Sequence, residues 1–299
     1  MAATVVAVSR WHDRPARRGS RGARVRRLAT RISVIVALLI ATVVAVFPVF
    51  VTVVTAFTPS QETNKWPPHL FPASWTLSNF AALGSLIPIG RQALNSVIFA
   101  GGVTVLSLTF DTLAAYALAR IDFRGRRVVF VVMVTTMMIP FQALLIPLYQ
   151  FLTRLGLVGS LAGMIVPRAA DVAGIFLLRQ FFVALPRDLD NAARIDGAGE
   201  LRVLFSIILP NAGPALLTLG LFNFVGNWND LLWPLIMTSG ADGRPLTAGV
   251  AALKGSISAT TPYGVLMAGS LLAMIPLVVI FLLVQRRFIE GVTASGFKG

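Results

Sequence analysis

The chain has 299 residues, of which 56% are apolar and only 13% are charged, with a net charge of +14 and a mean hydropathy of +0.78. Soluble domains carry about 25% charged residues, so this composition excludes an ordinary soluble domain and favours an integral membrane protein. The chain has no cysteine, which excludes a disulfide framework, a thiolate metal site and a thiol nucleophile. Its two histidines, His12 and His69, do not have the spacing of a zinc motif.

Residues 1–31 are rich in arginine, and nine of the 26 basic residues of the chain lie there. We expect a disordered cytoplasmic tail that helps to fix the orientation of the chain and contacts anionic lipid. The other basic residues flank apolar runs. We therefore attribute the positive charge to membrane topology and not to nucleic-acid binding.

Six apolar segments follow the tail, and each is long enough to cross a bilayer, which takes about 20 helical residues. The first, residues 32–57, is too long for the apolar part of a secretory signal peptide, which has about 7–15 residues. The other five spans are expected at 94–119, 127–150, 160–183, 213–237 and 264–285. We predict an all-α integral membrane protein in which residues 32–299 form one six-span domain.

The distribution of basic residues predicts the orientation of these spans. If the N-terminus is cytoplasmic, twenty arginines and lysines fall in the inner segments and five in the outer ones. The positive-inside rule then places both termini in the cytoplasm. Segment 187–210, between the fourth and fifth spans, is cytoplasmic in the same arrangement.

Segment 187–210 is unusually polar for this chain and is expected to form two short helices. Asp188 is predicted to cap the first helix, where acidic charge is favourable. Gly197 allows a sharp turn, and a second helix with apolar residues at helical spacing runs until Pro210 ends it. The residues alone leave two interpretations open: an amphipathic element on the membrane without a partner, or a docking element, which the small residues of the first helix favour.

Several motifs in this chain resemble those of ABC importer permeases. N-A-A-x-x-D-G-A at 191–198 and I-I-L-P at 207–210 look like the cytoplasmic signature loop of that family. Further similarity lies in A-A-Y-A-L-A-R (114–120), D-F-R-G (122–125), I-P-F-Q-A-L-L-I-P-L-Y (139–149), F-L-L-R-Q-F-F (176–182), W-N-D-L-L-W-P-L-I (228–236) and the C-terminal G-V-T-A-S-G-F-K-G (291–299). Over roughly residues 30–299 the chain is similar to carbohydrate permeases of the maltose type (MalG-like).

The resemblance implies that the segment 187–210 holds a coupling helix that docks on a separate ATPase subunit. The residues implied in coupling are Asp188, Asn191, Ala192, Ala193, Asp196 and Gly197. Asn191 departs from the family, which usually has Glu there, and an amide cannot form the ion pair that a carboxylate makes with a basic partner. Asp188 lies three positions earlier on the same helix face and is expected to substitute in part.

The resemblance also implies the partners of the chain. These are a second permease subunit in a heterodimer, an ABC ATPase dimer that holds ATP and Mg, an extracytoplasmic sugar-binding protein, and the lipid of the bacterial cytoplasmic membrane. The sequence has no G-x-x-x-x-G-K-[ST] phosphate-binding loop, no catalytic dyad and no metal-ligand cluster. We therefore expect a transport subunit that is not an enzyme and binds no cofactor, metal or nucleic acid itself.

Two predicted spans carry polar side chains, which are costly in a membrane and usually face a cavity or a partner. Arg168 and Asp171 share a face of the fourth span, and Asn223, Asn227 and Asp230 share a face of the fifth. With a rise of about 1.5 Å per residue, the two faces lie at similar depth and are able to meet. We expect them to line the translocation path and to hydrogen-bond sugar hydroxyls. The alternative is a structural Arg–Asp pair with interhelical amide contacts.

Asp111, in the inner half of the second span, is expected to accept hydrogen bonds from a neighbouring helix or to be protonated. Three other functions remain possible for the whole chain. The same architecture is able to import another small polar solute, such as a polyamine or a phosphodiester. A self-sufficient secondary transporter should show inverted repeats and an intramembrane acid for ion coupling, and no convincing repeat is present. A membrane receptor or scaffold would not need a docking loop.

Overall fold

The computed structural model describes residues 21–63, 71–256 and 262–296, and this part of the chain is helical without strands. Residues 1–20 of the basic tail, His12, His69 and the last three residues of the C-terminal motif lie outside the described residues. The helices are α1 (Arg21–Ala56), α2 (Ser60–Thr63), α3 (Ser78–Leu86), α4 (Ile89–Arg120), α5 (Arg126–Thr136), α6 (Phe141–Arg154), α7 (Leu161–Ile165), η1 (Val166–Arg168), α8 (Val172–Ala184), α9 (Asp188–Ile195), α10 (Glu200–Val203), η2 (Leu204–Ile208), α11 (Leu209–Asn211), α12 (Gly213–Trp228), α13 (Leu232–Met237), η3 (Ala241–Gly243), α14 (Leu246–Ser256) and α15 (Tyr263–Gly296).

The chain divides into two compact units, residues 1–51 and 52–299. The first unit contains most of α1, whose described side chains are all exposed as far as Val51 although the helix is strongly apolar. Such a surface is stable in lipid and not in water. The helix begins at Arg21, so the prediction of a disordered tail up to residue 31 is wrong for its last eleven residues. Arginine is a good helix former, and the apolar helix therefore extends back into the basic segment.

Three helical segments are single and long enough to cross a membrane: Leu28–Ala56, Ile89–Arg120 and Tyr263–Gln285. They correspond to the first, second and sixth predicted spans. Three further pairs of helices pass the same test only if each bent pair is one span. The structure therefore has three to six candidate spans. The first two pairs match the third and fourth predicted spans, whereas the last pair, Glu200–Asn211 with Gly213–Trp228, begins and ends before the fifth predicted span does.

The third predicted span is the most strongly broken. It consists of α5 and α6, which meet at an angle of 96° across residues 137–140. Pro140 stands directly before α6 with an extended backbone, φ −65° and ψ 133°. Its ring fixes φ and it has no N–H to continue the helix from α5, which accounts for the break at this position.

The fourth and fifth predicted spans are interrupted near their polar residues. The helical segment Leu161–Arg168 and α8 differ in direction by 42°, and the side chain of Asp171 caps α8 by accepting from Ala173 N at 3.2 Å. In the fifth span, α12 ends at Trp228 and α13 begins only at Leu232. The expected helix faces are therefore interrupted at Asp171 and Asp230, whereas Asn223 and Asn227 lie within α12 and share a face as expected.

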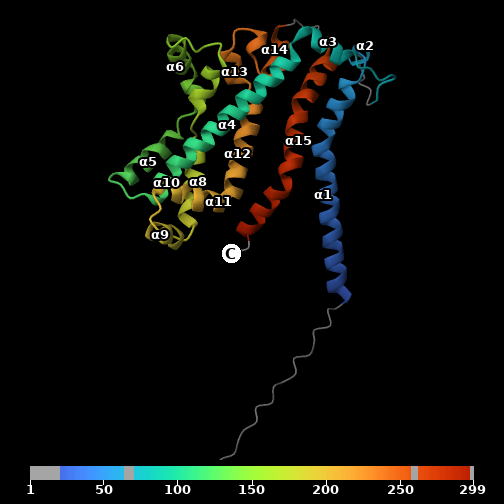
Figure 1. The fold of residues 1–299 in the computed structure, drawn as a ribbon. Coiled ribbons are helices and arrows are strands. Elements are labelled where there is room, and N and C mark those ends of the chain that lie inside the picture. The colour runs from blue at the N-terminus through green and yellow to red at the C-terminus, as the bar shows by residue number, and fades with distance from the viewer. Residues whose placement is uncertain (1–20, 64–70, 257–261, 297–299) are drawn as a thin grey trace, which may run out of the picture. The chain divides into compact units, whose positions relative to one another are not determined.

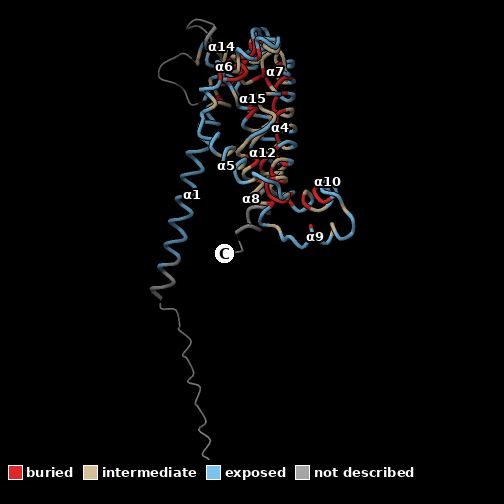
Figure 2. The backbone as a smooth tube through the Cα atoms, turned by 90° about the vertical axis from the view of Figure 1, so that its left-hand side faces the viewer, coloured by how far each residue is buried: buried red, intermediate tan, exposed pale blue. Residues whose placement is uncertain are grey.

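Helices α4, α8 and α12 run side by side and form the centre of the second unit (Figure 1). Buried residues concentrate along them, while the outward-facing residues of the surrounding helices are exposed (Figure 2). One core cluster joins the last turns of α4 to α8, η2 and the start of α12. A second core cluster joins α4, through Phe99 and Val103, to α6, α7 and α13. The helix α4 is therefore the element that both clusters share.

Candidate functional site: a helical segment at one end of α4 and a polar cavity along it

The first site is segment 187–210, which projects from one end of the helical core in both views (Figures 1 and 2). Its first helix, α9, begins at Asp188 after Arg187, and no side chain caps it. The prediction that Asp188 is the N-cap is therefore wrong, although Asp188 and Asp190 do place acidic charge in the first turn. Of the six predicted coupling residues, five are exposed, and Ala193 is half-buried against the core.

The turn after α9 requires a glycine. Gly197 has φ +80°, in the left-handed region that other residues rarely adopt. Its N–H donates to Arg194 O at 3.0 Å, and Ala198 N donates to Ala193 O at 2.9 Å. This pair of hydrogen bonds is a Schellman motif, which closes the carbonyl end of the helix and sends the chain back towards the core. The predicted glycine turn is present in the structure.

The second part of the segment differs from its prediction. Helix α10 continues through the π-helical turn η2 and through α11 to Asn211. Pro210 lies in the first turn of α11, where the missing N–H of a proline is tolerated. The predicted end at Pro210 is therefore wrong, and the bend lies at Ala212, where the direction changes by 81° into α12.

The buried side of α9 is held by an ion pair. Arg120, the last residue of α4, lies 3.1 Å from a carboxylate oxygen of Asp190, and their side chains are 1% and 2% exposed. The same guanidinium donates to Phe182 O at 2.5 Å and Leu185 O at 2.9 Å, at the end of α8. Arg120 therefore joins α4, α8 and α9 through one side chain. A buried charge that is held by several partners is costly to leave unpaired, so this junction is strongly constrained.

A second polar contact joins α4 to the start of α10. Tyr116 Oη donates to Glu200 at 2.6 Å, and Arg194 donates to both oxygens of the same carboxylate at 2.9 and 3.0 Å. The hydrogen bonds from Arg194, and then that from Tyr116, hold the pKa of Glu200 below its ordinary value. The same contact raises the pKa of Arg194. Glu200 is thus ionised at neutral pH and fixes the geometry between α9 and α10.

The second site is a cavity of about 600 Å³ between α7–α8, α12 and the start of α6. It is lined by four of the five predicted path residues, Arg168, Asp171, Asn223 and Asn227. The fifth, Asp230, is bonded to Arg168, whose guanidinium also lies 5.3 Å from the ring centre of Phe141. Arg168 and Asp230, which the sequence predicted to be able to meet, are therefore in contact in the structure. Their side chains are 26% and 16% exposed, so the pair is open on one side.

A chain of hydrogen bonds connects the cavity wall to α4. Asn227 donates to Asn223 Oδ1 at 2.7 Å, and Asn223 donates to Ser107 Oγ at 2.9 Å. Ser107 donates to Asp111 at 2.7 Å, and the other oxygen of Asp111 accepts from the backbone N–H of Asp171 at 2.8 Å. The expectation that Asp111 accepts a hydrogen bond from a neighbouring element is confirmed. This buried carboxylate links α4 to the start of α8, and Ser107 links α4 to α12.

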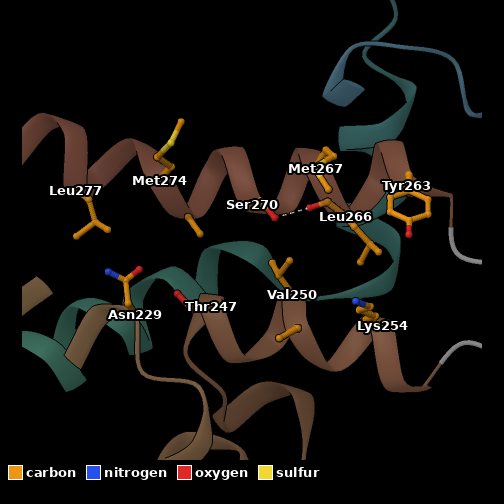
Figure 3. Close-up of a pocket in the computed structure, with 12 residues that line it drawn as sticks. Asn229, Thr247, Val250, Lys254, Tyr263, Leu266, Met267, Ser270, Met274 and Leu277 are labelled. Atoms are coloured by element: carbon orange, nitrogen blue, oxygen red, sulfur yellow. Dashed lines mark hydrogen bonds between the residues drawn. The ribbon is translucent and has the colours of Figure 1, made fainter. Parts of the chain in front are cut away.

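Another cavity, of about 420 Å³, lies between α14 and α15 near the end of α12 (Figure 3). Its lining is largely apolar, with Val250, Leu266 and Leu277 among the residues that line it. Ser270 uses its hydroxyl within its own helix, donating to Leu266 O at 2.9 Å. None of the predicted path residues lines this cavity, and the polar cavity beside α4 is the better candidate for a hydrophilic solute.

Sequence reasoning missed Arg120 and Asp190 as a pair. Arg120 was counted only as one of the basic residues that set topology. Asp190 precedes Ala193 by three positions, and Ala193 is the one predicted coupling residue that packs against the core. Residues three apart share a helix face, so the inward face of α9 carries a carboxylate, and a basic residue at the end of a neighbouring helix was the partner to look for.

Comparison with known proteins gives the family of this fold. The family model described as "Binding-protein-dependent transport system inner membrane component" matches residues 111–293. The arabinooligosaccharides transport system permease protein AraQ of Halalkalibacterium halodurans is 36% identical over 254 residues, which cover 83% of this chain and 89% of the relative. The sn-glycerol-3-phosphate transport system permease protein UgpE of Yersinia pestis is 36% identical over 208 residues, covering 70% and 74%.

A solved structure shares the fold. The crystal structure of a bacterial ABC transporter involved in the import of the acidic polysaccharide alginate includes a chain that matches with a TM-score of 0.77 and 24% sequence identity. The match covers 90% of this chain and 98% of the other. The relatives are permease components of transport systems and not enzymes, in agreement with the prediction made from the sequence.

Proposed function

Because the chain belongs to the family of binding-protein-dependent transport system inner membrane components, we propose that it is one permease subunit of an ABC importer of sugars. In this proposal the six spans of the bacterial cytoplasmic membrane are the three single helices, the two bent pairs that begin at Arg126 and Leu161, and the fifth predicted span, which begins with α12 after the cytoplasmic segment 187–210. Both termini lie in the cytoplasm. The excess of basic residues in the inner segments supports that orientation. The similarity to AraQ over most of both chains is the observation that carries the proposal.

The proposed assembly contains a second permease subunit, an ATPase dimer and an extracytoplasmic sugar-binding protein. ATP and Mg bind to the ATPase, and this chain supplies half of the translocation path together with the docking surface. The exposed apolar helix of the first unit, residues 28–51, is consistent with a surface that lipid or another permease subunit covers. No cofactor or metal is proposed for this chain.

We assign ATPase docking to the exposed face of α9. Asp188, Asn191, Ala192 and Asp196 are exposed there, and Gly197 closes the helix without a side chain. The apolar side chain of Ile195 is 86% exposed at the end of the same helix. A short helix with small and apolar exposed residues is suited to insertion into a cleft of a partner. Asn191 contributes a hydrogen bond there in place of the ion pair that a glutamate would make.

We assign the solute path to the cavity lined by Arg168, Asp171, Asn223 and Asn227. Arg168 is the only cation among the described residues that line it, and Asp230 neutralises its charge. The cavity therefore offers amides, a paired guanidinium and the carboxylate of Asp171, which suit neutral hydroxyl groups and disfavour an anion. A phosphate group, as in sn-glycerol 3-phosphate, would need to displace Asp230 from Arg168. This favours a neutral sugar over the phosphorylated solute of the relative UgpE.

Purification of the chain from its native membrane tests the proposal. We expect an ATPase subunit and a second permease subunit to be recovered with it and identified by mass spectrometry. In vesicles, the complex with its binding protein should take up a labelled arabinooligosaccharide in an ATP-dependent manner, and labelled sn-glycerol 3-phosphate much less. Recovery of the chain alone would contradict the importer. Uptake of the phosphate ester in preference to the sugar would contradict the solute class only.

A further inference from the structure

We propose that α4 transmits movement of the docking segment to the wall of the polar cavity, with Arg120 and Asp111 as the positioning residues at its two points of attachment. The proposal rests on the proposed function, because it assumes that α9 docks on an ATPase. It adds a second route of coupling to the one that the chain connectivity provides through α10, α11 and α12.

The first attachment joins α9 to the end of α4. Arg120 contacts Asp190 at 3.1 Å, and both side chains are almost completely buried. Its hydrogen bonds to Phe182 O and Leu185 O add the end of α8 to the same junction. Movement of α9 relative to α4 would separate these charges inside the protein, which is strongly unfavourable because each ion would be left buried without its partner. Displacement of α9 is therefore expected to carry the end of α4 with it.

The second attachment joins α4 to the cavity. The carboxylate of Asp111 accepts from Asp171 N, at the start of α8, and from Ser107, which in turn accepts from Asn223 on α12. Asp171 and Asn223 line the cavity. Gly174 lies so close to Asp111 that a Cβ atom there would collide with the carboxylate. Asp111 therefore has direct contact with one wall of the cavity and holds the other through Ser107.

The part of α4 between the two attachments is suited to transmit movement. Arg120 and Asp111 are nine residues apart, about 14 Å along the helix. Residues 107–120 contain neither proline nor glycine, and α4 is unbroken from Ile89 to Arg120. The alternative route through α10 and α12 contains a π-helical turn and the 81° bend at Ala212. A continuous helix transmits displacement with less loss than one with a bend, because bends absorb changes in backbone angles.

A labelling experiment is able to follow the cavity wall without knowledge of the solute. The chain has no cysteine, so Ala170→Cys introduces a single thiol in this subunit. Ala170 is exposed and lines the polar cavity. The complex with its ATPase and second permease, in lipid nanodiscs, is treated with a small maleimide without nucleotide and again with ATP and vanadate. Labelling of this subunit is measured by mass spectrometry, and we expect the rates in the two states to differ several-fold.

The positioning residues are then changed in this background. Asp190→Asn and Asp111→Asn keep the side-chain size but remove the charge at each attachment. Asp190→Asn is expected to lower the yield of folded protein, because Arg120 loses its counter-ion, so labelling is measured on the assembled complex. In that complex we expect both variants to retain the ATPase and to hydrolyse ATP, while the ATP-dependent difference in labelling falls to less than half. Asp190→Glu keeps the carboxylate and should retain most of the difference. Arg126→Ala removes an exposed ion pair with Asp122 just beyond the end of α4 and serves as the matched control, with no change expected.

The results separate this proposal from the proposed function. An unchanged labelling difference in both Asp190→Asn and Asp111→Asn, with the ATPase bound, would overturn the role of α4. No labelling difference in the unmodified background would overturn it as well, because movement would not reach this wall. Failure of the unmodified chain to bring down any ATPase would instead contradict the proposed function. A variant that loses the ATPase altogether would show that the junction maintains the docking surface and would count against transmission.

Discussion

Two arginine–aspartate pairs occupy different environments in this protein, although each joins residues that are far apart in the sequence. Arg120 and Asp190 are 1% and 2% exposed, and Nη2 of Arg120 donates to the backbone carbonyls of Phe182 and Leu185. Arg168 and Asp230 are 26% and 16% exposed, and Arg168 lines a cavity of about 600 Å³. The first pair is closed to any ligand and holds three helices together. The second retains an open side that a solute is able to reach.

The difference shows that residue type alone does not separate a structural ion pair from a functional one. What separates them is how far the pair is buried and whether it borders a cavity. A buried charge pair is strongly destabilising to break, whereas a partly exposed pair contributes little to stability. Loss of the ion pair should therefore affect folding in the first case and transport in the second.

The largest expected effect follows the loss of Asp190. Asp190→Ala leaves the guanidinium of Arg120 buried without its counter-ion, which typically costs about 3–5 kcal/mol. We expect a large fall in the yield of folded protein and in its melting temperature in detergent. The exposed pair Arg126–Asp122 supplies the control, since Asp122→Ala should change the melting temperature very little. Equal melting temperatures for the Asp190→Ala variant and the unmodified protein would remove the distinction between the two pairs.

The next effect concerns the turn that presents α9. Gly197→Val places a β-branched residue at φ +80°, where the left-handed backbone conformation costs at least about 1–2 kcal/mol. We expect the turn to rearrange and the exposed face of α9 to shift, so that ATP hydrolysis becomes uncoupled from uptake. The ratio of solute imported to ATP hydrolysed in proteoliposomes measures this. The exposed Gly199, which has φ −73°, gives a matched control in Gly199→Ala. Normal co-purification and coupling of the Gly197→Val variant would count against the docking role.

At the cavity we expect a smaller effect, which should reduce transport and leave stability almost unchanged. Arg168→Gln combined with Asp230→Asn removes both charges, so no unpaired charge remains in the membrane. Uptake should fall about tenfold, equivalent to about 1.4 kcal/mol of lost interaction, while the melting temperature stays close to that of the unmodified protein. Initial rates of labelled sugar uptake and a thermal melt of the same preparation test both parts. If uptake were unchanged in a well-assembled complex, the pair would be structural like Arg120–Asp190.

Much of this comparison was accessible from the sequence, for identifiable physical reasons. The membrane requires long apolar helices, so the spans could be located, and helix rise predicted that Arg168 and Asp230 lie at the same depth. The sequence did not reveal the 96° break before Pro140, because proline kinks a helix to a degree that tertiary packing decides. Arg120 and Asp190 were missed because a basic residue at the end of a span has an ordinary explanation in topology.

The smallest expected effect comes from Glu200, whose carboxylate links Arg194 and Tyr116 at the edge of the docking segment. Its pKa is lower in the folded protein than in the unfolded chain, so the unfolded state binds the proton more readily. The contact therefore stabilises the fold above the unfolded pKa and is lost as the pH falls through the folded pKa. The side chain is 45% exposed, so solvent screening limits its contribution to less than about 1 kcal/mol.

Glu200→Gln isolates this contribution. At neutral pH the variant should melt at a slightly lower temperature than the unmodified protein. The difference in melting temperature should close as the pH falls through the folded pKa of Glu200, below which the carboxyl is protonated in both states. A difference in melting temperature that stays constant with pH would assign the effect to packing and not to charge. A difference in melting temperature as large as that of Asp190→Ala would show that the exposure of an ion pair does not predict how much it stabilises this protein. The contrast between the buried pair Arg120–Asp190 and the partly exposed pair Arg168–Asp230 would then be wrong.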